Sequence, residues 1–189
     1  MLGGCTQLYS IVMRSFYGSV SGSFRGGIIL KIGIEGLLIQ TGTVEIRALS
    51  LDSFATWMVF IGVLINAAAP PISAWLADAY PESSPSGTVF LSAFTTKTAV
   101  LALILLFPGE QVLIWIGLYM IFYGIIYALL ENDMRRILAY SIVNQVGFMV
   151  CGIGIGTEMA INGAAAHAAT HAHPAAHAEA LAHHTHAEA

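Results

Sequence analysis

Residues 112–130, VLIWIGLYMIFYGIIYALL, decide the fold class of this chain because they form one unbroken apolar run. A bilayer core about 30 Å thick needs about 20 such residues in a helix, and a helix satisfies its own backbone in lipid. Three more stretches of this kind, bounded by polar or Pro/Gly-containing turns, lie at 54–69, 88–107 and 137–155. The sequence therefore predicts an all-α, polytopic transmembrane helix bundle.

A fifth, weaker span covers Gly26 to Gly42, which is short and contains Lys31 and Glu35. These two residues are four positions apart, so a helix places them on one face, where their charges neutralise each other. Counting this stretch gives about five spans in a transmembrane domain at residues 26–163. Residues 1–25 are mildly apolar and then Gly/Ser-rich, and we interpret them as an N-terminal remnant of another span.

The composition favours a membrane protein and excludes several other classes. Hydrophobic residues make up 57% of the chain and charged residues 10%, which is more apolar than a soluble core of this size requires. The seven Lys and Arg are scattered, so no nucleic-acid surface is expected. No nucleophile, metal-ligand set or cofactor motif stands out, and the two cysteines are far apart. We therefore expect no catalytic site, metal or cofactor within the chain, and a lipid bilayer around it.

Short connections between the spans predict that consecutive helices are antiparallel neighbours. Alternation then places the Pro81 loop and the Arg135-Arg136 pair on one side, and Glu158 on the other. The positive-inside rule makes the Arg135-Arg136 side cytoplasmic, as expected for an inner cell membrane. Asp133, Arg135 and Arg136 form either a charged cluster at a cytoplasmic mouth or an ordinary solvated turn.

Lys97 lies midway along the 88–107 stretch, where an ammonium facing lipid costs at least about 2.5–3.5 kcal/mol. An ionisable residue at such a depth points to function, and a lysine can bind and release a proton. Thr96 and the neighbouring hydroxyls can hold water beside it, or can bond back to the helix. The alternative for Lys97 is a structural ion pair with a carboxylate on another helix.

The run from Asn66 to Pro71 interrupts a span, because Pro70 and Pro71 remove two amide donors and disfavour helix just before them. At membrane depth, such a break is tolerated where its free carbonyls line a hydrated cavity. The alternative is a helix that ends at Ala69, followed by a segment lying in the membrane interface.

From Ala164 onward the composition changes abruptly to Ala and His, and all seven histidines fall in this part of the chain. We expect residues 164–189 to be a solvated, disordered low-complexity tail. His167 and His171 are spaced four apart and would share a helical face, which suits a proton relay or half a metal site. Coincidence within a histidine-rich tract is the competing explanation.

Four segments, residues 66–82, 91–100, 130–141 and 145–149, resemble one family in both sequence and spacing. They are similar to the antiporter-type membrane subunits. That family comprises the subunits of the Mrp sodium/proton antiporters and the proton-pumping membrane subunits of NADH:quinone oxidoreductase. The resemblance runs from about Phe54 to about His171.

The resemblance implies a bundle in which polar groups lie along a hydrated path at mid-membrane. Lys97 falls on the family's central lysine, His167 and His171 fall on its later polar or histidine positions, and Asn66 falls on the broken helix. The family's Asp-x-Lys/Arg-Arg turn corresponds to the turn that contains Asp133, Arg135 and Arg136.

Three departures from the family pattern matter. Asn66 replaces the lysine that many members have in the broken helix, and an amide cannot take up a proton. The family's membrane glutamate has no matched counterpart, because Glu35 is only in an approximate position. After His171 the Ala/His tail replaces the expected apolar continuation, so the chain resembles a central fragment of a longer member.

The leading hypothesis is a membrane subunit that moves protons, with exchange for sodium left open, among other subunits of an antiporter or respiratory complex. One alternative is a non-transporting scaffold, or degenerate fragment, that only packs against partner subunits. Another is a subunit of a quinone-reducing complex whose redox centres lie in other chains. The transported ion and the coupling source do not follow from the residues.

Overall fold

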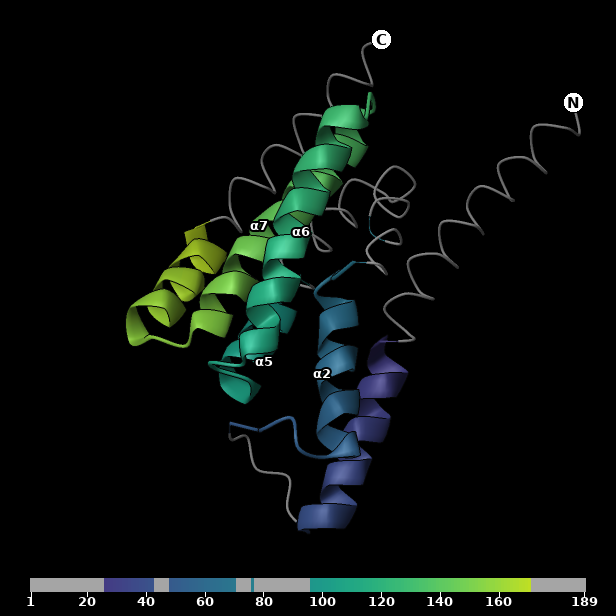
Figure 1. Cartoon of the computed structure of the whole chain (residues 1–189). Coiled ribbons are helices and arrows are strands. Elements are labelled where there is room, and N and C mark those ends of the chain that lie inside the picture. The colour runs from purple at the N-terminus through teal and green to yellow at the C-terminus, as the bar shows by residue number, and fades with distance from the viewer. Residues whose placement is uncertain (1–25, 43–47, 71–75, 77–95, 171–189) are drawn as a thin grey trace, which may run out of the picture.

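The computed structural model describes residues 26–42, 48–70, 76 and 96–170, and every regular element within them is an α-helix (Figure 1). The predicted all-α fold is therefore confirmed. Of these helices, α6 and α7 are long and apolar enough to cross a membrane, and α2 and α5 are shorter apolar helices. The elements are a helix at 26–41, α2 (Phe54–Asn66), α5 (Thr96–Leu106), α6 (Gln111–Leu130), α7 (Met134–Ile155) and a helix at 158–170.

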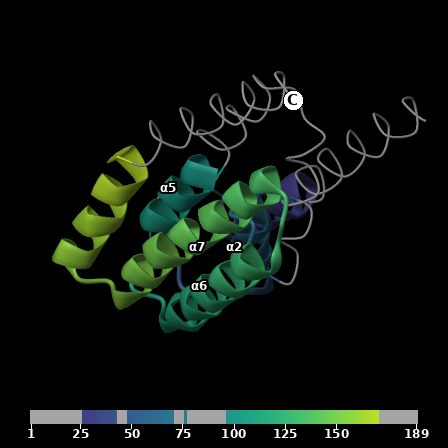
Figure 2. The ribbon, with the colours of Figure 1, turned by 90° about the horizontal axis from the view of Figure 1, so that it is seen from above.

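The hairpin of α6 and α7 is held together by glycines at the helix contact (Figure 2). A Cβ atom on Gly117 would lie 2.5 Å from the Cys151 nitrogen, and one on Gly124 would lie 2.8 Å from the Tyr140 carbonyl oxygen. The two glycines are seven residues apart, as are Gly147 and Gly154 on α7, so each pair recurs on one helix face. Small residues at this spacing let two membrane helices approach at backbone distance.

A second pair of helices, the 26–41 helix and α2, packs in the same way and lies side by side in Figure 1. A Cβ on Gly33 would lie 2.6 Å from the Val59 nitrogen, and one on Gly62 would lie 2.7 Å from the Leu30 nitrogen. Lys31 and Glu35 form the expected pair, with their charged atoms 3.8 Å apart, and both side chains are exposed. The ion pair therefore lies away from the contact with α2.

Helices α2 and α5 are antiparallel, and aromatic rings join them. The rings of Phe60 and Phe107 meet edge to face with centroids 5.1 Å apart, and both side chains are buried. The Leu49 amide, ahead of α2, donates to the Leu106 carbonyl at 2.7 Å, at the end of α5. The end of α2 at Asn66 consequently points toward the residues that open α5.

The turn between α5 and α6 is fixed to the end of α7. The Gly109 amide donates to the Ile153 carbonyl at 3.0 Å, and Gly156 ends α7 in a left-handed conformation. A Cβ on Gly156 would lie 2.5 Å from the Gly109 Cα, so neither backbone leaves room for a side chain. This contact sets the relative depth of α5 and α7.

The tail does not begin at Ala164 as predicted. A helix covers residues 158–170, lies beside α7 in Figures 1 and 2, and buries Ala164 to 5% exposure. Alanine is the best helix former. The small Ala164 side chain packs beside Gly152, since a Cβ on Gly152 would lie 3.6 Å from the Ala164 Cβ. Residues 164–170 are therefore part of the bundle, and residues 171–189 lie outside the described part of the chain.

Candidate functional site

Lys97 lies at the edge of the packed face of α5. The buried positions of this helix are Thr96, Ala99, Val100 and Leu103, which recur with helical spacing. Lys97 follows Thr96 by one residue, about 100° around the helix, so it is partly buried and not enclosed. A buried hydroxyl and a partly buried ammonium thus adjoin where α5 packs against α2 and α7.

Helix α2 ends at Asn66, inside the run that carries the prolines. Ala67 caps the helix with φ −74°, and Ala68 then takes φ 58° in the left-handed region. The Ala69 amide still donates to the Leu64 carbonyl at 3.0 Å, which closes the last turn. A non-glycine residue in the left-handed region costs roughly 1–2 kcal/mol, so the surrounding packing imposes the interruption.

The polar side chain at this helix end is the Asn66 carboxamide. It is partly buried and lies against Gly26, whose Cβ would be 3.0 Å from Asn66 Oδ1. Residues 67–70 are buried, and Pro71 lies outside the described residues. The amide is therefore placed by the contact between α2 and the 26–41 helix.

His167 lies on the 158–170 helix, one turn beyond Ala164. Its side chain is partly buried and its Nε2 atom is enclosed by protein. The helix packs on the end of α7, where a Cβ on Gly152 would lie 3.4 Å from the Ala160 carbonyl oxygen. His171 falls outside the described residues, so its position relative to His167 stays a prediction.

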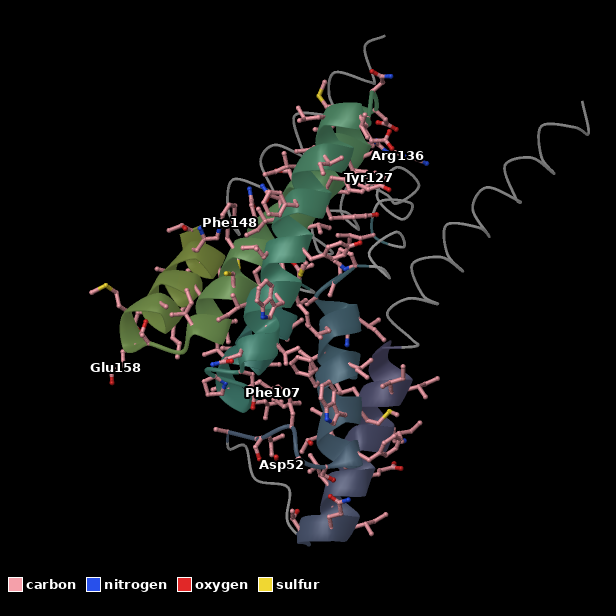
Figure 3. The ribbon with its side chains drawn as sticks, in the orientation of Figure 1. Asp52, Phe107, Tyr127, Arg136, Phe148 and Glu158 are labelled. Atoms are coloured by element: carbon pink, nitrogen blue, oxygen red, sulfur yellow. The ribbon has the colours of Figure 1, made fainter. Side chains whose placement is uncertain are left out.

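The charged turn between α6 and α7 lies at the end of the hairpin opposite Phe107 and Glu158, as Figure 3 shows. Asp133 caps α7, and its Oδ1 accepts a hydrogen bond from the Arg135 amide at 3.0 Å. Arg136 Nη1 lies 3.6 Å from Glu131 Oε1, a partly exposed pair of the kind worth about 0–1 kcal/mol. The cap fixes the start of α7, and both arginines there are partly exposed.

The sequence did not single out Asn144, although it stands inside the apolar helix α7. Its Oδ1 atom is enclosed and accepts no hydrogen bond from the described residues. A buried carbonyl left in this state costs about 1–3 kcal/mol. The available signal was a carboxamide in a membrane span, which is a functional position by default.

Lys97 and Asn144 lie at about the same depth. Each is nine residues before a residue at the shared end of α5 and α7, Leu106 and Ile153 respectively. At about 1.5 Å per residue, both lie roughly 14 Å from that end. The helix geometry thus places a lysine, a threonine hydroxyl and an amide whose oxygen has no hydrogen-bond partner among the described residues in one layer of the bundle.

These features first define a class, namely a membrane-spanning helical bundle that carries a lysine and an interrupted helix in its interior. Residues 14–187 match the family described as "NADH:quinone oxidoreductase/Mrp antiporter, TM". The match covers most of the chain, so the chain belongs to this family and is a membrane protein. The resemblance drawn from the sequence motifs is confirmed.

Individual relatives agree with the family match. NADH-quinone oxidoreductase subunit M of Pseudomonas aeruginosa is 28% identical over 159 residues, 72% of this chain and 31% of that protein. NADH-quinone oxidoreductase subunit N of Desulforudis audaxviator is 33% identical over 162 residues, 75% of this chain and 32% of that protein. A chain of the Mrp complex from Dietzia sp. DQ12-45-1b superposes with TM-score 0.78 and 27% identity, covering 87% of this chain and 34% of that one. The chain spans about a third of the length of these relatives.

Proposed function

We propose that this chain translocates protons across an inner cell membrane, together with other membrane subunits of an antiporter or respiratory complex. The observation that carries the proposal is Lys97, which is partly buried beside the fully buried Thr96 in a bundle of this family. A lysine at a helix contact keeps a titratable amine within the membrane, whereas an arginine there would stay charged. Lys97 is the proton-binding group in this proposal.

The other polar groups have supporting roles in the proposed path. Asn66, at the end of α2, orders water but takes up no proton, because a carboxamide is neutral at any physiological pH. His167, on the 158–170 helix, continues the path, and His171 is proposed to share this role. The break before Pro70 and Pro71 leaves backbone carbonyls that line the path. Asp133, Arg135 and Arg136 surround the cytoplasmic mouth of the path and attract ions to it.

The test is proton flux into vesicles that contain the complete complex. Lys97→Ala removes the amine and should abolish flux while the complex still assembles. Lys97→Arg should fail as well, because its charge is fixed. The chain offers a matched control in Lys31→Ala, which removes its other lysine from an exposed ion pair and should leave flux intact. Wild-type flux in Lys97→Arg would refute the proton-carrying role.

The same vesicles address exchange for sodium. If sodium moves against protons, an outward sodium gradient should drive proton uptake, and Lys97→Ala should abolish both fluxes together. Proton flux that does not depend on the sodium gradient would indicate proton transport without exchange for sodium.

One observation favours the scaffold alternative, namely an amide at Asn66 where many family members carry a lysine. A scaffold would assemble with its partners, and all Lys97 variants would match wild type in every flux. The flux series therefore separates a transporting subunit from a packing subunit.

The sidedness of the bundle is a separate part of the proposal. Cysteines introduced in place of Arg136 and Glu158 should react with an impermeant thiol reagent from opposite sides, the Arg136 position from the cytoplasm. Labelling of both positions from the same side would contradict the proposed topology. The loop at residues 81–87, expected on the cytoplasmic side as well, lies outside the described residues.

A further inference from the structure

The starting point is the Asn144 carboxamide, which the proposed path does not use. Its Oδ1 is enclosed by protein and accepts no hydrogen bond from any residue that the structure describes. Buried polar atoms in native proteins nearly always have a partner, so an exception calls for a water, an ion or a functional role. The amide orientation does not alter this conclusion, because its nitrogen would need a partner in the same place.

The neighbours of Asn144 show that the contact between α6 and α7 makes room for this side chain. A Cβ on Gly124 would lie 2.8 Å from the Asn144 Cβ, so only glycine lets the side chain pass between the helices. Tyr140 lies one turn earlier on the same face, and its ring stacks on Tyr127 with centroids 5.4 Å apart. An amide and two phenols therefore gather along one line of the hairpin.

The enclosure of Oδ1 limits what can reach it. Lipid and the side chains of other subunits are kept out, because the chain's own atoms already cover the oxygen. The missing donor has to be small and has to arrive from inside the bundle. Water fits this description, and the broad χ2 torsion of asparagine lets a modest rotation admit it.

We propose that Asn144 holds a water molecule within the α6–α7 contact, at the depth of Lys97, and that protons pass through this water. Only the second part of this inference, the passage of protons through the water, rests on the proposed function. Asn144 acts as a positioning residue, since it fixes the water by accepting its hydrogen bond and exchanges no proton itself. Tyr140 is the neighbouring group that the water would touch.

Two readouts test the proposal on the complete complex in vesicles. The first is proton flux, and the second is hydroxyl-radical labelling read by mass spectrometry, which oxidises side chains next to bound water. Tyr140 is only 8% exposed, so strong oxidation there would report internal water. The variants are Asn144→Leu, which keeps the shape but no polar atom, and Asn144→Ser, which keeps an acceptor. Cys151→Ala, on the same face against Gly117, is the matched control.

We expect Asn144→Leu to lower flux roughly tenfold, the effect of one lost hydrogen bond on a rate, and to lower Tyr140 oxidation several-fold. Asn144→Ser should restore most of both, and Cys151→Ala should change neither. Wild-type oxidation of Tyr140 in Asn144→Leu would overturn the water site, even if flux fell. Wild-type flux in Asn144→Leu would overturn its place in the path. If wild type carries no flux, the proposed function fails, and the oxidation readout still decides whether the water is bound.

Discussion

Gly117→Ala tests the glycine contact between α6 and α7. The new methyl carbon would lie 2.5 Å from the Cys151 nitrogen and 2.8 Å from the Gly147 carbonyl oxygen. Unstrained contacts between such atoms are about 3.5 Å, so α7 would have to retreat by roughly 1 Å. Both contacted atoms belong to the backbone and cannot rotate aside. Overpacking of this kind costs about 1–3 kcal/mol, and a rigid neighbour favours the upper part of that range.

The helix propensity of alanine opposes this cost by about 0.8–1.0 kcal/mol. The net expectation is a destabilisation of about 1–2 kcal/mol, or roughly 2–4 °C of melting temperature for each kcal/mol in a chain of this size. Thermal unfolding of the purified protein in detergent, followed by circular dichroism, measures it. Gly163→Ala is the matched control, because a Cβ there meets nothing within 4 Å. That variant should stabilise the protein by up to about 1 kcal/mol. If the two variants shifted the melting temperature in the same direction, the close approach of α6 and α7 would be refuted.

Two further paired predictions use the same measurement. Asp133→Ala should lower stability by about 1 kcal/mol because it removes the cap of α7, whereas Glu110→Ala should be nearly neutral, since Glu110 makes no side-chain cap bond to α6. Ala67→Gly and Ala68→Gly delete equally buried methyl groups, but only Ala68 has a positive φ. Ala68→Gly should therefore be less destabilising by about 1–2 kcal/mol, and equal losses would show that Ala68 is not strained.

The existence of the helices could be predicted from the sequence because long apolar runs have few other stable forms in a membrane. The run at 112–130 corresponds to α6, which begins at Gln111. The run at 137–155 starts three residues late, because α7 begins at Met134 under the Asp133 cap. The missing turn is polar, so hydropathy alone could not include it, although an aspartate ahead of an apolar run is a start signal.

The helix faces were harder to predict, for a physical reason. In a lipid environment apolar side chains mark neither the inside nor the outside of a bundle, so the apolar residues of α6 carry no orientation signal. Its orientation is determined instead by Gly117 and Gly124. These two glycines do not stand out among the larger apolar residues of the run. The same reasoning applies to Asn144, whose importance depends on Gly124 lying opposite.

The histidine region shows the opposite error. Low complexity suggested a solvated tail from Ala164, but repetitive alanine is also the composition of a tightly packed helix when a small partner such as Gly152 is available. The sequence shows the composition, but whether a partner exists is a tertiary property. His167 therefore belongs to a helix of the described bundle, whereas the placement of His171 remains a prediction.

The distribution of burial argues that α7 is the element around which any transport path is organised. In the most apolar stretch of each helix, 22% of the α6 residues and 56% of the α7 residues are buried, although both helices could span a membrane. The difference arises because α6 packs mainly on α7, whereas α7 also contacts α5 and the 158–170 helix.

A proton path needs polar groups shielded from lipid on every side, and among the described helices that could span a membrane, α7 offers the more shielded position. Lys97 belongs to α5 and His167 to the 158–170 helix, the two helices that pack on α7 beside α6, and Asn144 is part of α7 itself. Substitutions on the exposed face of α6 should accordingly be tolerated far better than polar-to-apolar changes at the depth of Asn144.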